Sequence, residues 1–193
     1  MTTSRKIGIL VFLALIVISC SLLSPTTIST PTPPVFSSTS LASAPTENVP
    51  ASWGKQTKTT GCQANGPLQD RACTPGAIFP NVTKDDICKS GYARSVRNVP
   101  ESEKNQDYAE YGITHHTTGQ YEVDHLISLE LGGSNDISNL WPEAASPVPG
   151  FHEKDQVENY LHDQVCSGAV SLQQAQIEIS TNWLAVYNSM PKK

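Results

Sequence analysis

The most informative stretch of this 193-residue chain is residues 121–142, YEVDHLISLELGGSNDISNLWP. Its first part alternates in side-chain character, as a strand does, and it ends at Asp124-His125. The pattern predicts two extended segments and then a turn, in residues 120–125, 126–131 and 132–136. Neighbouring strand residues point to opposite faces of a sheet, so Asp124 and His125 can serve one site only if the strand ends or bends there.

Upstream of this stretch, residues 53–82 are rich in Gly, Pro, Asn and Thr and show no helical or strand periodicity, so we expect an irregular region. Thr83 can cap a short helix that stops at Gly91. Residues 92–97 alternate as in a strand. A helix is predicted for residues 100–111, because a proline begins it and acidic residues fill its first turn.

Downstream, apolar residues at helical spacing predict a helix from Phe151 to Cys166 that stops at Gly168. Ser171 can cap a last helix. Its apolar stripe is expected to face the core and consists of Leu172, Ala175, Ile179, Trp183 and Val186. The predicted fold class is α+β, mostly helical, around a small ββα unit.

The N-terminal 20 residues have the pattern of an export signal. Arg5 and Lys6 precede a run of twelve residues, 7–18, that is apolar apart from one glycine. A run of that length is too short to span a membrane and suits a signal peptide. Ser19-Cys20 also resembles the end of the bacterial lipobox, which predicts lipidation of Cys20 and attachment to the membrane; an ordinary secretory signal is the alternative.

The next segment, residues 21–52, is expected to be a disordered tether. Of the 30 residues from Ser21 to Pro50, 19 are Ser, Thr or Pro, and only one is charged. The chain beyond the signal carries 11 positive and 18 negative residues, a net charge of −7. That charge disfavours passive electrostatic binding to nucleic acid or anionic lipid. With the signal and the tether set aside, the folded domain is expected to comprise residues 53–193. We expect the protein to be exported, either as a cell-surface lipoprotein or in secreted form.

Four cysteines remain beyond the signal, an even number in a chain sent to an oxidising compartment: Cys62, Cys73, Cys88 and Cys166. Two disulfides are expected. Of the three possible pairings we favour Cys62–Cys73 as a local loop and Cys88–Cys166 as a link between the early and late parts of the domain. A zinc site is the alternative, but no two of these cysteines are close in sequence.

Several features of the 121–142 stretch and of the following helix occur together. They are the Asp124-His125 pair, a Gly-Gly turn, Asn139 fourteen residues after the histidine, and a helix with a polar start. This combination resembles the HNH, or His-Me finger, nucleases. The resemblance implies a ββα-metal unit, in which a two-stranded hairpin and a helix hold one divalent metal beside a histidine base.

The resemblance also implies roles for individual residues. His125 matches the general base, Asp124 the metal ligand before it, and Asn139 the residue that orients the base. Phe151 falls on the usual metal-ligand position of the helix and cannot ligate, so Glu158 is our preferred second ligand and His152 the alternative. Lys154 matches a helix lysine common in the family. Independently of the resemblance, Arg94 and Arg97 are expected to bind substrate together with Lys154, and the alternative for the two arginines is pairing with acids.

The chemistry explains these residue types. Hydrolysis of a phosphodiester requires an activated water and a cation that neutralises charge on the phosphoryl oxygens. A neutral imidazole can take the proton of the water, and a carboxylate is a hard ligand suited to Mg²⁺, with Mn²⁺ or Zn²⁺ as alternatives.

A wider resemblance, over residues 73–187, is to a group of secreted bacterial HNH-like proteins. It implies an exported, monomeric, metal-dependent endonuclease with nucleic acid as its substrate. The alternative is a non-catalytic cell-envelope binding module on a degenerate HNH-like fold. The second metal ligand is the sequence feature that separates the two hypotheses.

Overall fold

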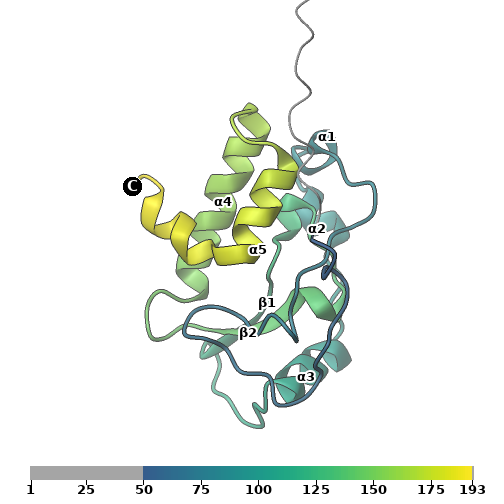
Figure 1. The fold of residues 1–193 in the computed structure, drawn as a ribbon, viewed down its shortest axis with the longest axis vertical. Helices are drawn as coiled ribbons and strands as arrows, with labels where there is room; N and C mark the ends of the chain where they lie inside the picture. Colours follow the sequence, from purple (N-terminus) through teal and green to yellow (C-terminus); the bar gives the residue numbers. More distant parts are fainter. Residues whose placement is uncertain (1–49, 193) are drawn as a thin grey trace, which may run out of the picture. The chain divides into compact units, whose positions relative to one another are not determined.

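The computed structural model describes residues 50–192 (Figure 1). The expected signal peptide, Cys20 and nearly all of the expected tether lie outside the described residues. Within the described part, no helix has the length and apolar character needed to cross a membrane. The elements are, in chain order, α1 (Lys84–Ile87), α2 (Tyr92–Val96), α3 (Glu101–Glu110), β1 (Tyr121–His125), the 3-10 helices η1 (Leu129–Leu131) and η2 (Ile137–Asn139), β2 (Leu140–Ala144), α4 (Phe151–Ser167) and α5 (Leu172–Ser189).

The fold mixes helices with one small antiparallel sheet, formed by β1 and β2. Asp124 pairs with Trp141 and Glu122 pairs with Glu143 in the strand register, while His125 pairs with a leucine at the end of the ladder. Cross-strand partners and alternate residues of a strand share a face. Glu122, Asp124 and Glu143 therefore lie on one face of the sheet.

The prediction of a second extended segment in residues 126–131 is wrong. Leu129–Leu131 form η1 instead, with Ser128 as its cap, and the strand that pairs with β1 is Leu140–Ala144. A short apolar run does not distinguish a strand from a buried turn of helix. Here the leucines of the run are fully buried in the core, so the run is apolar because it packs inside the protein and not because it forms a strand.

The strand predicted in residues 92–97 is also wrong, because Tyr92–Val96 form the helix α2. Gly91, just before it, adopts φ 81°, a left-handed conformation that glycine reaches without strain. This turn separates α2 from α1. The predicted cap at Thr83 is confirmed and Asp86 completes a capping box, but α1 ends at Ile87, before the expected stop at Gly91. The helix predicted in residues 100–111 is confirmed as α3, with Pro100 at its start.

The core lies mainly between α4 and α5, which pack side by side (Figure 1). The predicted helices from Phe151 and after Ser171 are both confirmed, and Gly168 ends α4 as expected. Ala175, Ile179 and Trp183 of the predicted stripe are completely buried. Their partners in the core include Ile87 of α1 and, from α4, Val157, Leu161 and Val165.

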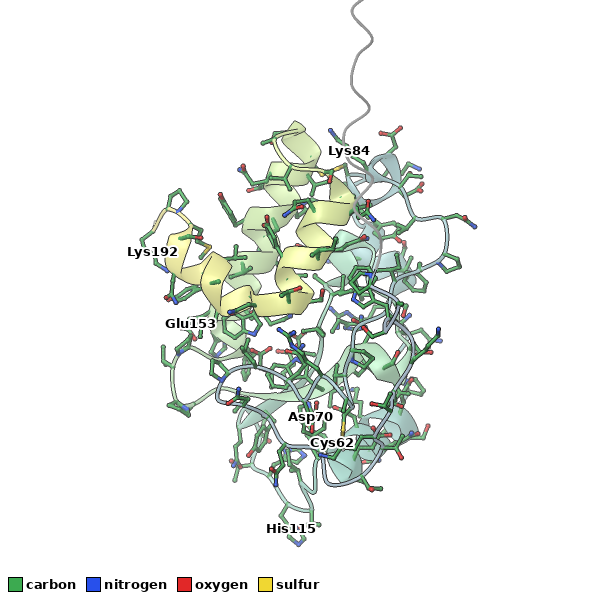
Figure 2. All side chains as sticks on the ribbon, in the orientation of Figure 1. Cys62, Asp70, Lys84, His115, Glu153 and Lys192 are labelled. Atoms are coloured by element: carbon green, nitrogen blue, oxygen red, sulfur yellow. A yellow bond between two sulfur atoms is a disulfide. The ribbon has the colours of Figure 1, made fainter. Side chains whose placement is uncertain are left out.

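Both predicted disulfides are confirmed. Cys62–Cys73 closes a local loop, and Cys88–Cys166 joins the end of α1 to α4. Residues 53–82 contain no helix or strand, as predicted. They are held by polar contacts such as the one between the Gln63 amide and Asp70, near Cys62 (Figure 2). Disulfides of this kind persist in oxidising compartments, in agreement with export.

Candidate functional site

His125 ends β1 and is almost completely buried, with 1% of its surface exposed. Its Nε2 lies 3.2 Å from Oδ1 of Asn135, and Nδ1 has no hydrogen-bond partner among the described residues. Burial lowers the pKa of His125 to about 4, although the neighbouring Asp124 carboxylate acts in the opposite direction. The imidazole is therefore neutral at pH 7, with a lone pair on one nitrogen, and its low pKa makes it a weaker base than a free histidine.

Asn139 forms hydrogen bonds with the backbone of the segment that follows His125. Its side chain is completely buried and makes four hydrogen bonds to backbone: Oδ1 accepts from the amides of Ala77 and Ile127, and Nδ2 donates to the carbonyls of Ile127 and Ser134. None of these bonds reaches the imidazole. Asn139 therefore holds the loop on which His125 sits, whereas the expectation was that it orients the ring.

The Gly-Gly turn allows this loop to close. A Cβ atom on Gly133 would lie 1.6 Å from the carbonyl oxygen of Ile127, so only glycine fits there. Gly132 adopts φ 76°, which also favours glycine. The Gly133 amide donates to the Ser128 carbonyl, and this bond brings the turn back against the segment after β1.

Lys154 of α4 is the central cation of the site. Its side chain is completely buried, and its ammonium donates to Oδ2 of Asp124 at 2.6 Å, to the His125 carbonyl at 2.9 Å and to Glu158. These bonds use all three ammonium hydrogens. Lys154 thus holds β1 against α4, and in this arrangement it has no hydrogen left for a substrate phosphate, which was its expected role.

The acids around Lys154 differ in their pKa values. Burial alone would raise the pKa of Asp124, but the charge and hydrogen bond of Lys154 outweigh burial and hold that pKa below its usual range. Burial raises the pKa of Glu158 to about 7 against the opposing effect of Lys154. Burial would lower the pKa of Lys154, but the surrounding carboxylates raise it instead, so the ammonium stays charged.

Glu143 of β2 is an acid that the sequence analysis missed. It is 1% exposed, and among the described residues no amide, hydroxyl or ammonium group donates to its carboxyl oxygens. Its side-chain hydrogen bond is with the Asp124 carboxyl. Burial raises its pKa well above the usual range, and the nearby Asp124 carboxyl adds to this effect. Glu143 lies near Asp124 because it pairs with Glu122, two residues before Asp124 in β1. The sequence analysis did not predict β2, so it could not locate Glu143.

Asp124 and Glu143 bring two buried carboxyl groups together on one face of the sheet, and their oxygens would suit a hard divalent cation only once Glu143 has lost its proton. The other two expected ligands are placed differently. Glu158 is committed to Lys154 and to the Ser128 hydroxyl, and His152 is exposed in the first turn of α4, with its ring against Phe151. In the described residues, neither Glu158 nor His152 lies with Asp124 in a cluster of three side chains close enough to bind one metal ion.

One other group in residues 50–192 has the composition of a metal site. The ligand atoms of Cys88, His162 and Cys166 all lie within 4.8 Å of one another, so this group could hold a metal ion. The two sulfur atoms are joined as a disulfide, and a thiolate is the form of cysteine that binds metals. A metal could therefore bind to the sulfurs only after reduction of that bond.

Of the two arginines expected to bind substrate, Arg97 lies near the acids of the site and Arg94 does not. The positive charge of Arg97 opposes the burial effects that raise the pKa values of Glu122 and Asp155, so Arg97 lies near both acids. It also lines a cavity of about 250 Å³ beside β1, together with Lys104. Arg94 is exposed on α2 and makes no hydrogen bond or ion pair with the site residues within the described part of the chain.

Comparison with protein-family models, with curated proteins and with solved structures gives no match for this chain.

Proposed function

We propose that this protein is an exported, metal-dependent endonuclease of the HNH type, with His125 as its general base. The observation that carries the proposal is the state of that histidine: a neutral imidazole beside Asp124, with an unpaired Nδ1. The order of β1, β2 and α4 supports the proposal, since it is the order of a ββα unit.

In the proposed reaction, Nδ1 of His125 takes a proton from water as the oxygen attacks a phosphodiester. A neutral imidazole has a lone pair that can accept this proton, although the lowered pKa makes His125 a weaker base than a free histidine. Asn139 and Gly133 keep the loop after β1 closed, and Lys154 holds the His125 carbonyl, so the backbone that follows the base is fixed.

Asp124 and Glu143 would hold the divalent cation, which when bound supplies positive charge for the phosphoryl oxygens and the leaving group. Arg97 and Lys104 would contact the phosphate backbone from the cavity beside β1. These two cations lie at an opening of the surface, whereas Lys154 is buried. Arg97 and Lys104 would have to attract the polyanion locally, because Glu122 lines the same cavity and the chain beyond the signal carries a net charge of −7.

The test is cleavage of supercoiled plasmid and of single-stranded RNA by the full chain, with Mg²⁺, Mn²⁺, Zn²⁺ or EDTA. We expect His125→Ala to lower the metal-dependent rate by about 10²–10⁴-fold. The matched control is His115→Ala, since His115 is exposed at a tip of the domain (Figure 2) and should have no effect. An unchanged rate in folded His125→Ala would contradict the proposal.

A second function, that of a non-catalytic cell-envelope binding module, is favoured by one specific observation. Lys154 satisfies Asp124 and Glu158 inside the protein, as a purely structural ion network would. Under this alternative no metal supports cleavage by the wild-type protein. Asp124→Asn would then change only stability, whereas under the nuclease proposal it also weakens metal binding, so that part of its activity returns at high metal concentration.

A further inference from the structure

The Asn135 side chain connects the His125 ring to the segment that follows α2. Its Oδ1 lies 3.2 Å from Nε2 of His125 and also accepts from the Asn98 amide at 3.1 Å. Its Nδ2 donates to the Val96 carbonyl at 2.8 Å. Asn135 lies in the turn between β1 and β2, some 37 residues from Asn98 along the chain.

The two backbone partners fix which way the Asn135 amide points. A backbone N–H can only donate and a carbonyl can only accept, so a flipped amide would set donor against donor at Asn98 and acceptor against acceptor at Val96. The oxygen of Asn135 therefore faces His125. Because that oxygen cannot donate, Nε2 of His125 must carry the ring hydrogen.

A neutral imidazole has a single N–H, so a hydrogen on Nε2 leaves Nδ1 as the nitrogen with the lone pair. This is the nitrogen that has no partner among the described residues. A carboxylate or carbonyl on the second nitrogen of an active-site histidine fixes both its tautomer and its orientation in the same way.

We propose that Asn135 is a positioning residue for His125: it selects the tautomer with hydrogen on Nε2 and presents Nδ1 as the proton acceptor. Asn139 cannot have this role because all its hydrogen bonds go to backbone. The inference rests on the proposed phosphodiester hydrolysis for its functional meaning, but the tautomer can be measured without any substrate.

The first experiment is NMR of the full chain labelled with ¹⁵N in the histidine rings, with the His125 signals assigned by their loss in His125→Gln. In the wild type at neutral pH we expect a protonated Nε2 and an unprotonated Nδ1. Asn135→Leu, of similar shape, removes the acceptor and should populate the other tautomer. Asn135→Asp keeps an acceptor oxygen and should preserve Nε2–H.

The second experiment measures cleavage rates of the same variants. We expect Asn135→Leu to lower kcat by about 10–100-fold, with KM within about twofold, and Asn135→Asp to retain most of kcat. The control is Asn98→Ala, which keeps the backbone amide that Asn135 binds. Its kcat and KM should equal those of the wild type.

A hydrogen on Nδ1 of wild-type His125 would overturn the inference even if Asn135→Leu does not fold. Wild-type kcat in folded Asn135→Leu would overturn it as well. Absence of cleavage by the wild type, combined with the expected tautomer, would instead refute the proposed nuclease function and leave the positioning of the ring by Asn135 intact.

Discussion

Substitution of Lys154 by methionine should destabilise the protein more than any other single loss of charge in the domain. The ammonium is completely buried, and the side chains of its two acidic partners, Asp124 and Glu158, are only 10% and 13% exposed. Methionine fills similar volume but leaves two buried carboxylates facing each other without a cation. Breaking a buried ion pair in this way costs about 3–5 kcal/mol.

The matched control is Lys104→Met. Lys104 lies 3.7 Å from Glu101 on the surface, where the two side chains are 43% and 77% exposed. A surface pair of this kind contributes about 0–1 kcal/mol. The two variants make the same chemical change, so the difference between them measures the effect of burial.

The assay is guanidinium denaturation of both variants and the wild type, at pH 8 and at pH 5. The deficit of Lys154→Met should be smaller at pH 5, because Asp124 and Glu158 can then take up protons and lose their mutual repulsion. A loss below about 1 kcal/mol at pH 8, no larger than for Lys104→Met, would refute the view that the ammonium holds β1 and α4 together.

Three further predictions concern stability. Asn139→Ala should cost about 3 kcal/mol or more in urea denaturation, because it leaves buried backbone groups unpaired; a loss under about 1 kcal/mol would mean that the loop does not depend on this side chain. Burial, with help from neighbouring acids, raises the pKa of Asp107 from 3.8 to about 8, so its contribution to stability should fall as pH rises through that range. The free energy of unfolding of Asp107→Asn should therefore rise relative to that of the wild type between about pH 5 and pH 8. A difference that stays constant over this range would contradict the prediction. Replacing Cys88 and Cys166 together by alanine opens a link over 78 residues and should cost about 4–5 kcal/mol in thermal or urea unfolding; a loss under about 1 kcal/mol would contradict this.

The sequence predicted those elements whose signal is local. The spacing of apolar residues located α4 and α5, the Thr83 cap located α1, and the even cysteine count after the leader led to both disulfides. Each of these signals lies within one element or follows from the oxidising compartment. They required no knowledge of the tertiary arrangement.

Features that depend on tertiary contacts could not be predicted in the same way. The sequence of β2, LWPEA, contains a proline and only five residues, so it has no clear alternation. Without β2, Glu143 has no position relative to Asp124. Asn135 resembles any turn asparagine until the segment after α2, far away in sequence, supplies its backbone partners.

His125 gives the strongest reason to expect chemistry at this site. An unpaired buried nitrogen costs about 1–3 kcal/mol, and a protein that used position 125 only for packing would be as stable or more stable with an apolar ring there. Phenylalanine removes the unpaired nitrogen but also the Nε2–H bond to Asn135, so we expect His125→Phe to fold with close to wild-type stability and to lose cleavage. A marked loss of stability in His125→Phe would show that the imidazole is needed by the scaffold. The nitrogen would then need no catalytic role to explain its presence, and the case for the non-catalytic module would be stronger. A stable but inactive variant would instead indicate that the cost of the unpaired nitrogen is tolerated because the reaction uses it.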